Sequence, residues 1–181
     1  MGKRELDHNK PVPHSVWLCP QIGQGPPLTE EIAAYAQRFG TAVFEPHVTL
    51  LGDLRTAPQL TVAACRSLSG RLPKTTACIS RVSQTADFFM SLFLDLDITE
   101  AVTSARAELA SALGMALPQP FRPHLSLAYG LPAGEPGQQA LQELSDRLVG
   151  QTLTLHELKV VFSAKEIAIE DWRAIHVEHL N

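Results

Sequence analysis

Two short segments of the chain repeat the same set of chemically active residues. One reads FEPHVTLLG and the other FRPHLSLAYG, and in each a histidine, His47 or His124, is followed two residues later by a hydroxyl, Thr49 or Ser126. An imidazole takes or gives a proton near neutral pH, and a hydroxyl can donate a hydrogen bond to a phosphate oxygen. Two such sets facing each other across a cleft could hold a phosphodiester between a general base and a general acid.

The duplication is more informative than either copy alone. A single histidine beside a strand threonine is usually a partly buried polar residue. Packing requires apolar residues, however, and does not require a histidine at the matching place of a second segment. The separation of 124 − 47 = 77 residues is too long for a solenoid or propeller repeat, so it indicates a duplicated half-domain with a shared function.

Each motif is predicted to lie on a strand, where residues two apart point to the same face, so each histidine should stand beside its hydroxyl. Periodicity predicts helices over residues 28–40, 57–70, 98–114 and 136–150, with Thr29 and Thr99 as caps for the first and third. Strands are predicted over residues 15–19, 45–52, 75–82, 88–96, 123–129, 152–163 and 172–180. This mixed order with hairpins favours an α+β antiparallel fold.

Composition indicates a small globular protein with one core. The chain has 181 residues, of which 45% are apolar and 19% charged. We predict a flexible arm over residues 1–13 and one domain over residues 14–181. The net charge of −4, without a run of Lys and Arg, argues against a partner such as long nucleic acid. The three cysteines lack CxxC spacing and the N-terminal residues lack a signal-peptide pattern, so we expect a cytoplasmic monomer that does not bind membranes.

The sequence offers no credible metal or cofactor motif. His176 and His179 are three residues apart, which places them on opposite faces of a strand. HExxH, paired CxxC and carboxylate clusters are all missing from the sequence, and the glycines at Gly23 and Gly25 precede two prolines, as in a turn. We therefore predict catalysis without metal or cofactor.

The duplicated HVTL and HLSL motifs resemble those of the two-histidine (2H) phosphoesterases. The segments SVWLCP, RVSQTADFFMSLFL, PHLSLAY and DWRAIHVEHL are most similar to the plant-type cyclic phosphodiesterases, and the resemblance runs from about Ser15 to the end. It implies a bilobal fold in which two pseudo-symmetric lobes, each with an antiparallel sheet and outer helices, surround a central cleft. It also implies metal-independent hydrolysis.

The same resemblance implies substrates and roles. Members of this branch open ADP-ribose 1″,2″-cyclic phosphate to the 1″-phosphate and nucleoside 2′,3′-cyclic phosphates to 2′-phosphates. Carried over, His47 and His124 are the catalytic pair, and Thr49 and Ser126 bind the phosphate. In-line displacement puts the water and the leaving oxygen on opposite sides of phosphorus, which requires two separate proton-transfer groups. The resemblance favours His124 as the base and His47 as the acid, whereas the symmetry of the motifs does not distinguish them.

Three aromatic residues are further candidates for substrate binding. Tyr129, Phe89 and Trp172 match aromatic positions of the plant branch, and aromatic faces commonly stack on bases. A regular strand would turn Tyr129 away from His124, so it reaches the site only if the strand ends or bulges first. Core packing is the alternative role for all three.

Two other functions compete with hydrolysis of small cyclic phosphates. One is an RNA-end-processing enzyme, a 2′,3′-cyclic phosphodiesterase or a 2′-5′ RNA ligase-like enzyme, for which Arg81, Arg122 and Arg173 could form a local basic rim. The other is a module that binds nucleotides without turnover. Both motifs are intact, and a binding module has no chemical need for two proton-transfer groups.

Overall fold

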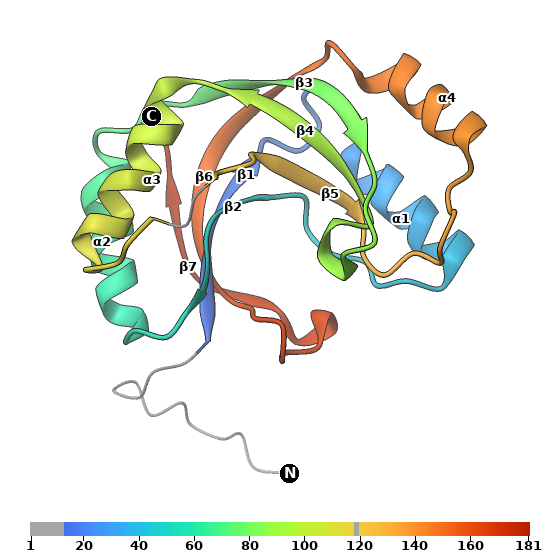
Figure 1. Cartoon of the computed structure of the whole chain (residues 1–181). Coiled ribbons are helices and arrows are strands. Elements are labelled where there is room, and N and C mark those ends of the chain that lie inside the picture. The colour runs from blue at the N-terminus through green and yellow to red at the C-terminus, as the bar shows by residue number, and fades with distance from the viewer. Residues whose placement is uncertain (1–12, 118–119) are drawn as a thin grey trace.

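The computed structural model of the chain describes residues 13–117 and 120–181 (Figure 1). The predicted arm over residues 1–13 lies, except for its last residue, outside this part, and the predicted domain over residues 14–181 remains a prediction. No helix among the described residues is long and apolar enough to cross a membrane.

The described residues form four α-helices, two short 3₁₀ turns and seven strands. The helices are α1 (Leu28–Phe39), α2 (Pro58–Ser69), α3 (Glu100–Ala112) and α4 (Gln138–Leu148), and the turns are η1 (Phe88–Met90) and η2 (Ile169–Asp171). The strands are β1 (His14–Pro20), β2 (Val48–Leu54), β3 (Thr75–Ser83), β4 (Leu92–Ile98), β5 (His124–Ala128), β6 (Thr152–Phe162) and β7 (Arg173–His179). Every predicted helix and strand is present, with shifts of a few residues at the ends.

The predicted strand over residues 88–96 is wrong in its first part. Residues 88–90 form the turn η1, and the strand begins only at Leu92. The carboxylate of Asp87 accepts a hydrogen bond from the backbone N–H of Phe89 at 2.9 Å. This local bond stabilises a turn and outweighs the strand preference of two phenylalanines.

The helix cap predicted at Thr29 is wrong, and the one predicted at Thr99 is correct in position but lacks the capping hydrogen bond. Helix α1 already includes Thr29, and neither α1 nor α3 has a side-chain hydrogen bond at its N-cap. Thr99 is the N-cap residue of α3, but its hydroxyl pairs with that of Thr75 on β3 at 2.9 Å. The threonine thus links a helix start to the sheet instead of capping the helix.

The strands form one antiparallel sheet in the order β1-β2-β5-β4-β3-β6-β7, and β1 also pairs with β6. Six strands therefore close into a ring, with β7 added outside β6. Figure 1 shows the sheet curving around the centre, with α2 and α3 against one half and α1 and α4 against the other. The α+β fold with two lobes is confirmed, and its two halves share a single sheet.

The pair β2–β5 joins the two halves through the strands that carry the two motifs. Arg106 of α3 is buried, donates to the carbonyl of Leu50 on β2 at 3.0 Å, and lies 4.2 Å from the ring centre of Phe121. One side chain thus holds both motif segments, because Leu50 and Phe121 belong to the first and the second copy.

Candidate functional site

The register between β2 and β5 places the two motifs opposite each other. Val48 pairs with Leu125 in antiparallel orientation, and both side chains are buried. Because neighbours along a strand alternate faces, the residues before and after this pair point to the other face. His47, Thr49, His124 and Ser126 therefore share one face of the sheet, as the spacing of two predicted.

The two imidazoles are held by the same kind of hydrogen bond. The Nδ1 of His47 lies 2.6 Å from the carbonyl oxygen of Glu45, and the Nδ1 of His124 lies 2.8 Å from that of Arg122. A carbonyl oxygen only accepts, so each Nδ1 carries a proton and donates it. Each Nε2 is thereby left to accept or release the second proton, which is the arrangement a general base or acid needs.

The surroundings of the two histidines differ. His47 is 6% exposed and stacks on Trp17 with ring centres 3.6 Å apart and planes at 8°. Burial, together with the nearby His124, lowers the pKa of His47 to about 4. The hydrogen bond to Glu45 opposes this shift. His124 is only half-buried, and its ring centre lies 5.4 Å from that of Phe93 in an edge-to-face arrangement. Because its pKa is about 4, His47 is neutral in the free protein at neutral pH.

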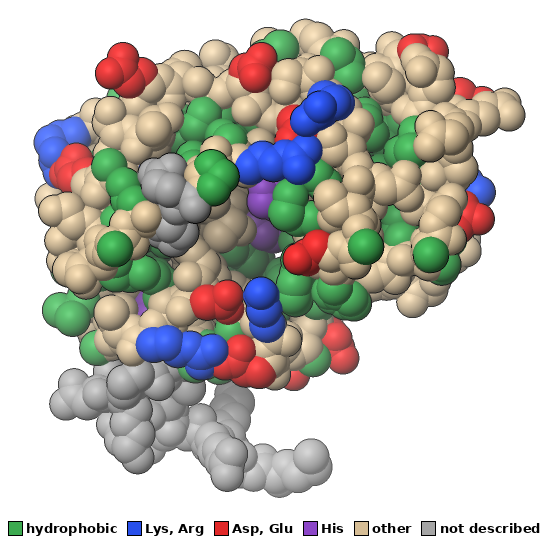
Figure 2. All heavy atoms as spheres, viewed as in Figure 1, with side chains coloured by type: hydrophobic (Ala, Val, Ile, Leu, Met, Phe, Trp, Pro, Cys, Tyr) green, Lys and Arg blue, Asp and Glu red, His purple; other side chains and the backbone are tan. Residues whose placement is uncertain are grey.

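Both histidines line one cavity of about 270 Å³, and Thr49 lies in its wall. Figure 2 shows a hollow in the molecular surface with a histidine visible inside it and hydrophobic, basic and acidic side chains around it. Because residues 77 positions apart in sequence (124 − 47) meet in one hollow, the site depends on the fold and not on a local segment.

Ser126 differs from Thr49 in its contacts. Its side chain is 4% exposed, does not line the cavity, and donates a hydrogen bond to the carbonyl of Phe89 at 3.0 Å. In this state the hydroxyl of Ser126 fixes the turn η1, whose residues Phe89 and Met90 line the cavity. It would have to rotate to donate to a phosphate.

Tyr129, Phe89 and Trp172 all line the cavity. Tyr129 reaches it because β5 ends at Ala128, which is the condition that the sequence set for this residue. Tyr129 is also packed in the core: its ring stacks on Phe44 at 4.0 Å, and burial raises its pKa despite a hydrogen bond with Ser126. The rings of Phe89 and Trp172 are nearly parallel at 6.1 Å.

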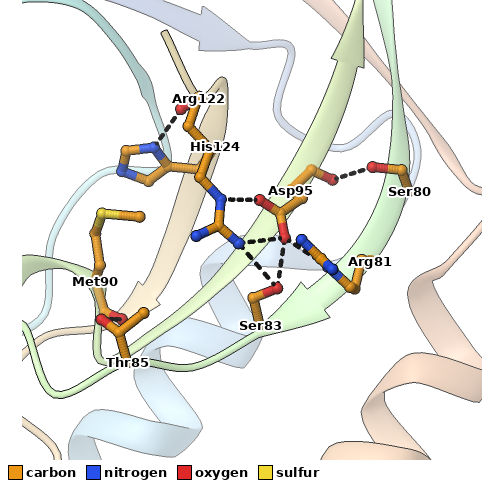
Figure 3. A network of polar contacts seen from close by, with 8 residues as sticks. All are labelled: Ser80, Arg81, Ser83, Thr85, Met90, Asp95, Arg122 and His124. Carbon is orange, nitrogen blue, oxygen red and sulfur yellow. Dashed lines mark hydrogen bonds and ion pairs between the residues drawn. The ribbon is translucent and has the colours of Figure 1, made fainter. Parts of the chain in front are cut away.

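A charged network lies behind His124 (Figure 3). Asp95 of β4 is the register partner of His124 and accepts hydrogen bonds from Arg122 at 2.6 and 3.0 Å, from Arg81 at 3.0 Å, and from Ser83. Partial burial opposes ionisation of Asp95, but the bonds from Arg122, Ser83 and Arg81 outweigh it and lower its pKa to about 2. Since the carbonyl of Arg122 holds His124, this network positions the imidazole.

The network also changes the interpretation of the basic rim. Arg81 and Arg122 are paired with one carboxylate, and the guanidinium of Arg173 lies over the ring of Phe162 at 5.0 Å. Two of the three predicted cations are therefore ion-paired, and the single negative charge of Asp95 offsets one of their two positive charges.

Sequence reasoning did not identify Trp17, Asp95 or Lys165. Trp17 pairs in register with Thr49 across β1–β2, and Lys165 lines the cavity from the loop after β6. Trp17 lies in a predicted strand with no motif of its own. Its role depends on which strands pair, and only the tertiary structure gives that information.

His176 and His179 contact different carboxylates, as expected for opposite faces of a strand. His176 lies 2.5 Å from Glu178, whereas His179 lies 3.2 Å from Glu157. His156, Glu157 and His179 bring their ligand atoms within 4.8 Å of one another, and none of the three lines the cavity. Lys159 also pairs with Glu157, at 3.1 Å, and supplies a positive charge where a cation would have to bind.

Comparison with known proteins supports the two-histidine interpretation. Residues 19–165 match the sequence model of a family described as the 2′-5′ RNA ligase superfamily. No curated protein matches the chain. Among solved structures, E. coli LigT complexed with phosphate is 14% identical, with a TM-score of 0.57 and coverage of 94% of this chain and 98% of that one.

Two further structures agree with that result. A structure described as a phosphoesterase is 15% identical over 94% of this chain and 99% of its own, with a TM-score of 0.59. The protein TT0787 of Thermus thermophilus is 13% identical over 93% of this chain and 98% of its own, with a TM-score of 0.58. At this level of identity the likeness establishes the fold, and it extends over nearly the whole chain.

Proposed function

We propose that this chain, which belongs to the 2′-5′ RNA ligase superfamily of two-histidine phosphoesterases, hydrolyses small cyclic phosphates by paired acid and base catalysis without a metal ion. The substrates proposed are ADP-ribose 1″,2″-cyclic phosphate, opened to the 1″-phosphate, and nucleoside 2′,3′-cyclic phosphates, opened to 2′-phosphates. The protein acts in this proposal as a monomer in the cytoplasm.

One observation supports this function above the others: both histidines line a single cavity and donate from Nδ1 to the carbonyl two residues earlier. Each presents its Nε2 as the second titrating atom. Two imidazoles held by the same kind of hydrogen bond, brought together from the two halves of the fold, suit a reaction that needs one proton removed and one supplied.

The protonation of the free protein favours His47 as the base. Its imidazole is neutral at pH 7, so Nε2 can take a proton from the attacking water as the water oxygen bonds to phosphorus. A protonated His124 then gives its Nε2 proton to the ribose oxygen as the P–O bond breaks on the opposite side. This assignment reverses the one that the resemblance favours, so a direct test of the roles is needed.

Phosphate binding is proposed for Thr49 first. Its hydroxyl lies in the cavity wall on the face that carries both histidines. Ser126 contributes after its hydroxyl turns away from Phe89, and before that it holds η1 in place. The rings of Phe89 and Trp172 form an apolar wall on which a nucleobase can stack.

A second candidate is the processing of RNA ends that carry 2′,3′-cyclic phosphates, which the description of the matched family favours. The chemistry would be the same. Long RNA would require basic surface along its path, and the two arginines next to the site are paired with Asp95.

The deciding experiment offers ADP-ribose 1″,2″-cyclic phosphate, nucleoside 2′,3′-cyclic phosphates and cyclic-ended RNA side by side and identifies the products. Opening of the small substrates to 1″- and 2′-phosphates supports the proposal, whereas exclusive turnover or joining of RNA supports the second candidate. Binding of all three without turnover would leave only a binding module.

The roles of the histidines are separated by a 4-nitrophenyl ester of a nucleotide, whose leaving group departs without protonation. Loss of the acid should matter little for this ester, whereas loss of the base should still abolish turnover. If His124→Ala retains ester hydrolysis and His47→Ala does not, His47 is the base. The opposite result restores the assignment that the resemblance favours.

A further inference from the structure

We propose that Lys165 binds a second, non-reacting phosphate of the substrate, so that the enzyme prefers cyclic phosphates that carry another phosphate group. This inference rests on the proposed function, because it assumes that the reacting phosphate lies between the two histidines. It assigns to Lys165 a role in specificity and none in proton transfer.

The position of Lys165 fits this role. The lysine follows β6 in a loop whose residues Ser163 and Ala164 also line the cavity. The hydroxyl of Ser15 on β1 donates to the carbonyl of Ser163 at 3.4 Å, which fastens the loop to the sheet. Lys165 is thus an exposed side chain on an anchored backbone at the edge of the cavity.

The charges around the site leave Lys165 available. Among the described residues that line the cavity it is the one lysine or arginine, and no described acidic group forms an ion pair with it. Its neighbour Glu166 pairs with Arg55, and Arg122 beside the site pairs with Asp95. The acidic residues that line the cavity with it, Asp53 and Asp87, form no ion pair with Lys165. The ammonium of Lys165 is therefore without an ionic partner among the described residues of the cavity and can bind an anionic group of the substrate.

The size of the cavity supports the same conclusion. Pockets that bury drug-sized ligands have volumes of about 300–1,000 Å³, and this cavity, at about 270 Å³, lies below that range. A nucleotide whose reacting phosphate lies between His47 and His124 must extend past the rim. Lys165 stands at that rim, where a flexible ammonium with three donors can follow a mobile phosphate.

The experiment measures equilibrium binding by calorimetry with two product analogues, adenosine 2′-monophosphate and adenosine 2′,5′-bisphosphate. The variant is Lys165→Gln, and the matched control is Lys74→Gln, which removes the same charge from an exposed lysine outside the cavity. Loss of a hydrogen bond to a charged group corresponds to about 10–100-fold in affinity. We expect the wild type and Lys74→Gln to bind the bisphosphate at least 10-fold more tightly, and Lys165→Gln to lose that preference while binding the monophosphate normally.

Each other result overturns the inference in a distinguishable way. If Lys165→Gln weakens both ligands equally, the lysine serves the reacting phosphate. If it changes neither, or if Lys74→Gln has the same effect, no second phosphate site exists at Lys165. Failure of the wild type to bind either ligand, together with no turnover of cyclic phosphates, would refute the proposed function itself.

Discussion

Replacing His47 by phenylalanine should make the protein more resistant to acid. Phenylalanine keeps a ring against Trp17 but cannot be protonated, whereas His47 is buried and has a pKa of about 4. In the unfolded chain the same imidazole has a pKa of about 6.5. The unfolded state therefore takes up the proton first, so acid shifts the equilibrium toward unfolding.

The magnitude follows from these two pKa values. Stability linked to His47 is complete above pH 6.5, falls as the pH drops toward 4, and is fully lost below 4. Each pH unit in this window is worth about 1.4 kcal/mol, which gives a loss of about 2 kcal/mol by pH 5 and about 3 kcal/mol by pH 4 relative to the variant. Loss of the hydrogen bond to Glu45 lowers the stability of the variant equally at every pH. The comparison is therefore between the slopes of unfolding free energy against pH and not between absolute values.

The assay is urea unfolding at pH 7, 6, 5 and 4, followed by tryptophan fluorescence and far-UV circular dichroism. Other titrating groups affect the wild type and His47→Phe alike, so the difference between the two curves isolates His47. A second non-titrating variant, His47→Gln, should show the same flattened slope. Parallel curves for the wild type and both variants would mean that His47 is not held neutral by burial, and the reasoning about its role as base would fail with it.

Four other predictions concern catalysis. The single changes His47→Ala and His124→Ala should each remove most of kcat/KM, and the double change should lower it little further. Steady-state kinetics on folded variants would test this, and additive losses would contradict a shared transition state. Thr49→Ala should lower kcat/KM by about 10–100-fold, which is less than the loss caused by removing either histidine. Ser126→Ala should also raise KM, because the hydroxyl of Ser126 holds the turn η1 that forms part of the cavity wall. Inactivation by Thr49→Ala as complete as that by His47→Ala would refute this division of roles. Dialysis against a strong chelator should leave turnover unchanged, and recovery only on addition of zinc, magnesium or manganese would show that the metal-free mechanism is wrong. Asp95→Asn should lower kcat more than it raises KM, because the ion pairs that position His124 are weakened; unchanged kcat in a folded variant would remove Asp95 from the site.

Periodicity along the chain predicted the face on which the motif residues lie. A spacing of two residues keeps His47 with Thr49 and His124 with Ser126 in any strand, whatever its neighbours. The structure then adds the pairing of Val48 with Leu125, which brings the two faces together.

The sequence could not show which residues of distant strands contact the two histidines. Asp95 lies opposite His124 only because β4 pairs with β5, and Trp17 stacks on His47 only because β1 pairs with β2. Nothing in the local sequence of either residue distinguishes it from an ordinary strand position. The turn at residues 88–90 was missed for the opposite reason: a single local hydrogen bond from Phe89 to Asp87 overrides the strand pattern of its neighbours.

The difference between the two halves provides the chemistry that a perfect duplication could not. Two identical imidazoles in identical surroundings would favour the same protonation state, whereas the reaction needs one neutral and one protonated. The fold keeps the shared element, a carbonyl that orients each Nδ1, and changes what surrounds each ring. Trp17 and burial keep His47 neutral, while the more open His124 is held next to the network of Asp95 and Arg122. In the proposed mechanism the duplication supplies the geometry and the divergence of the surroundings assigns the roles.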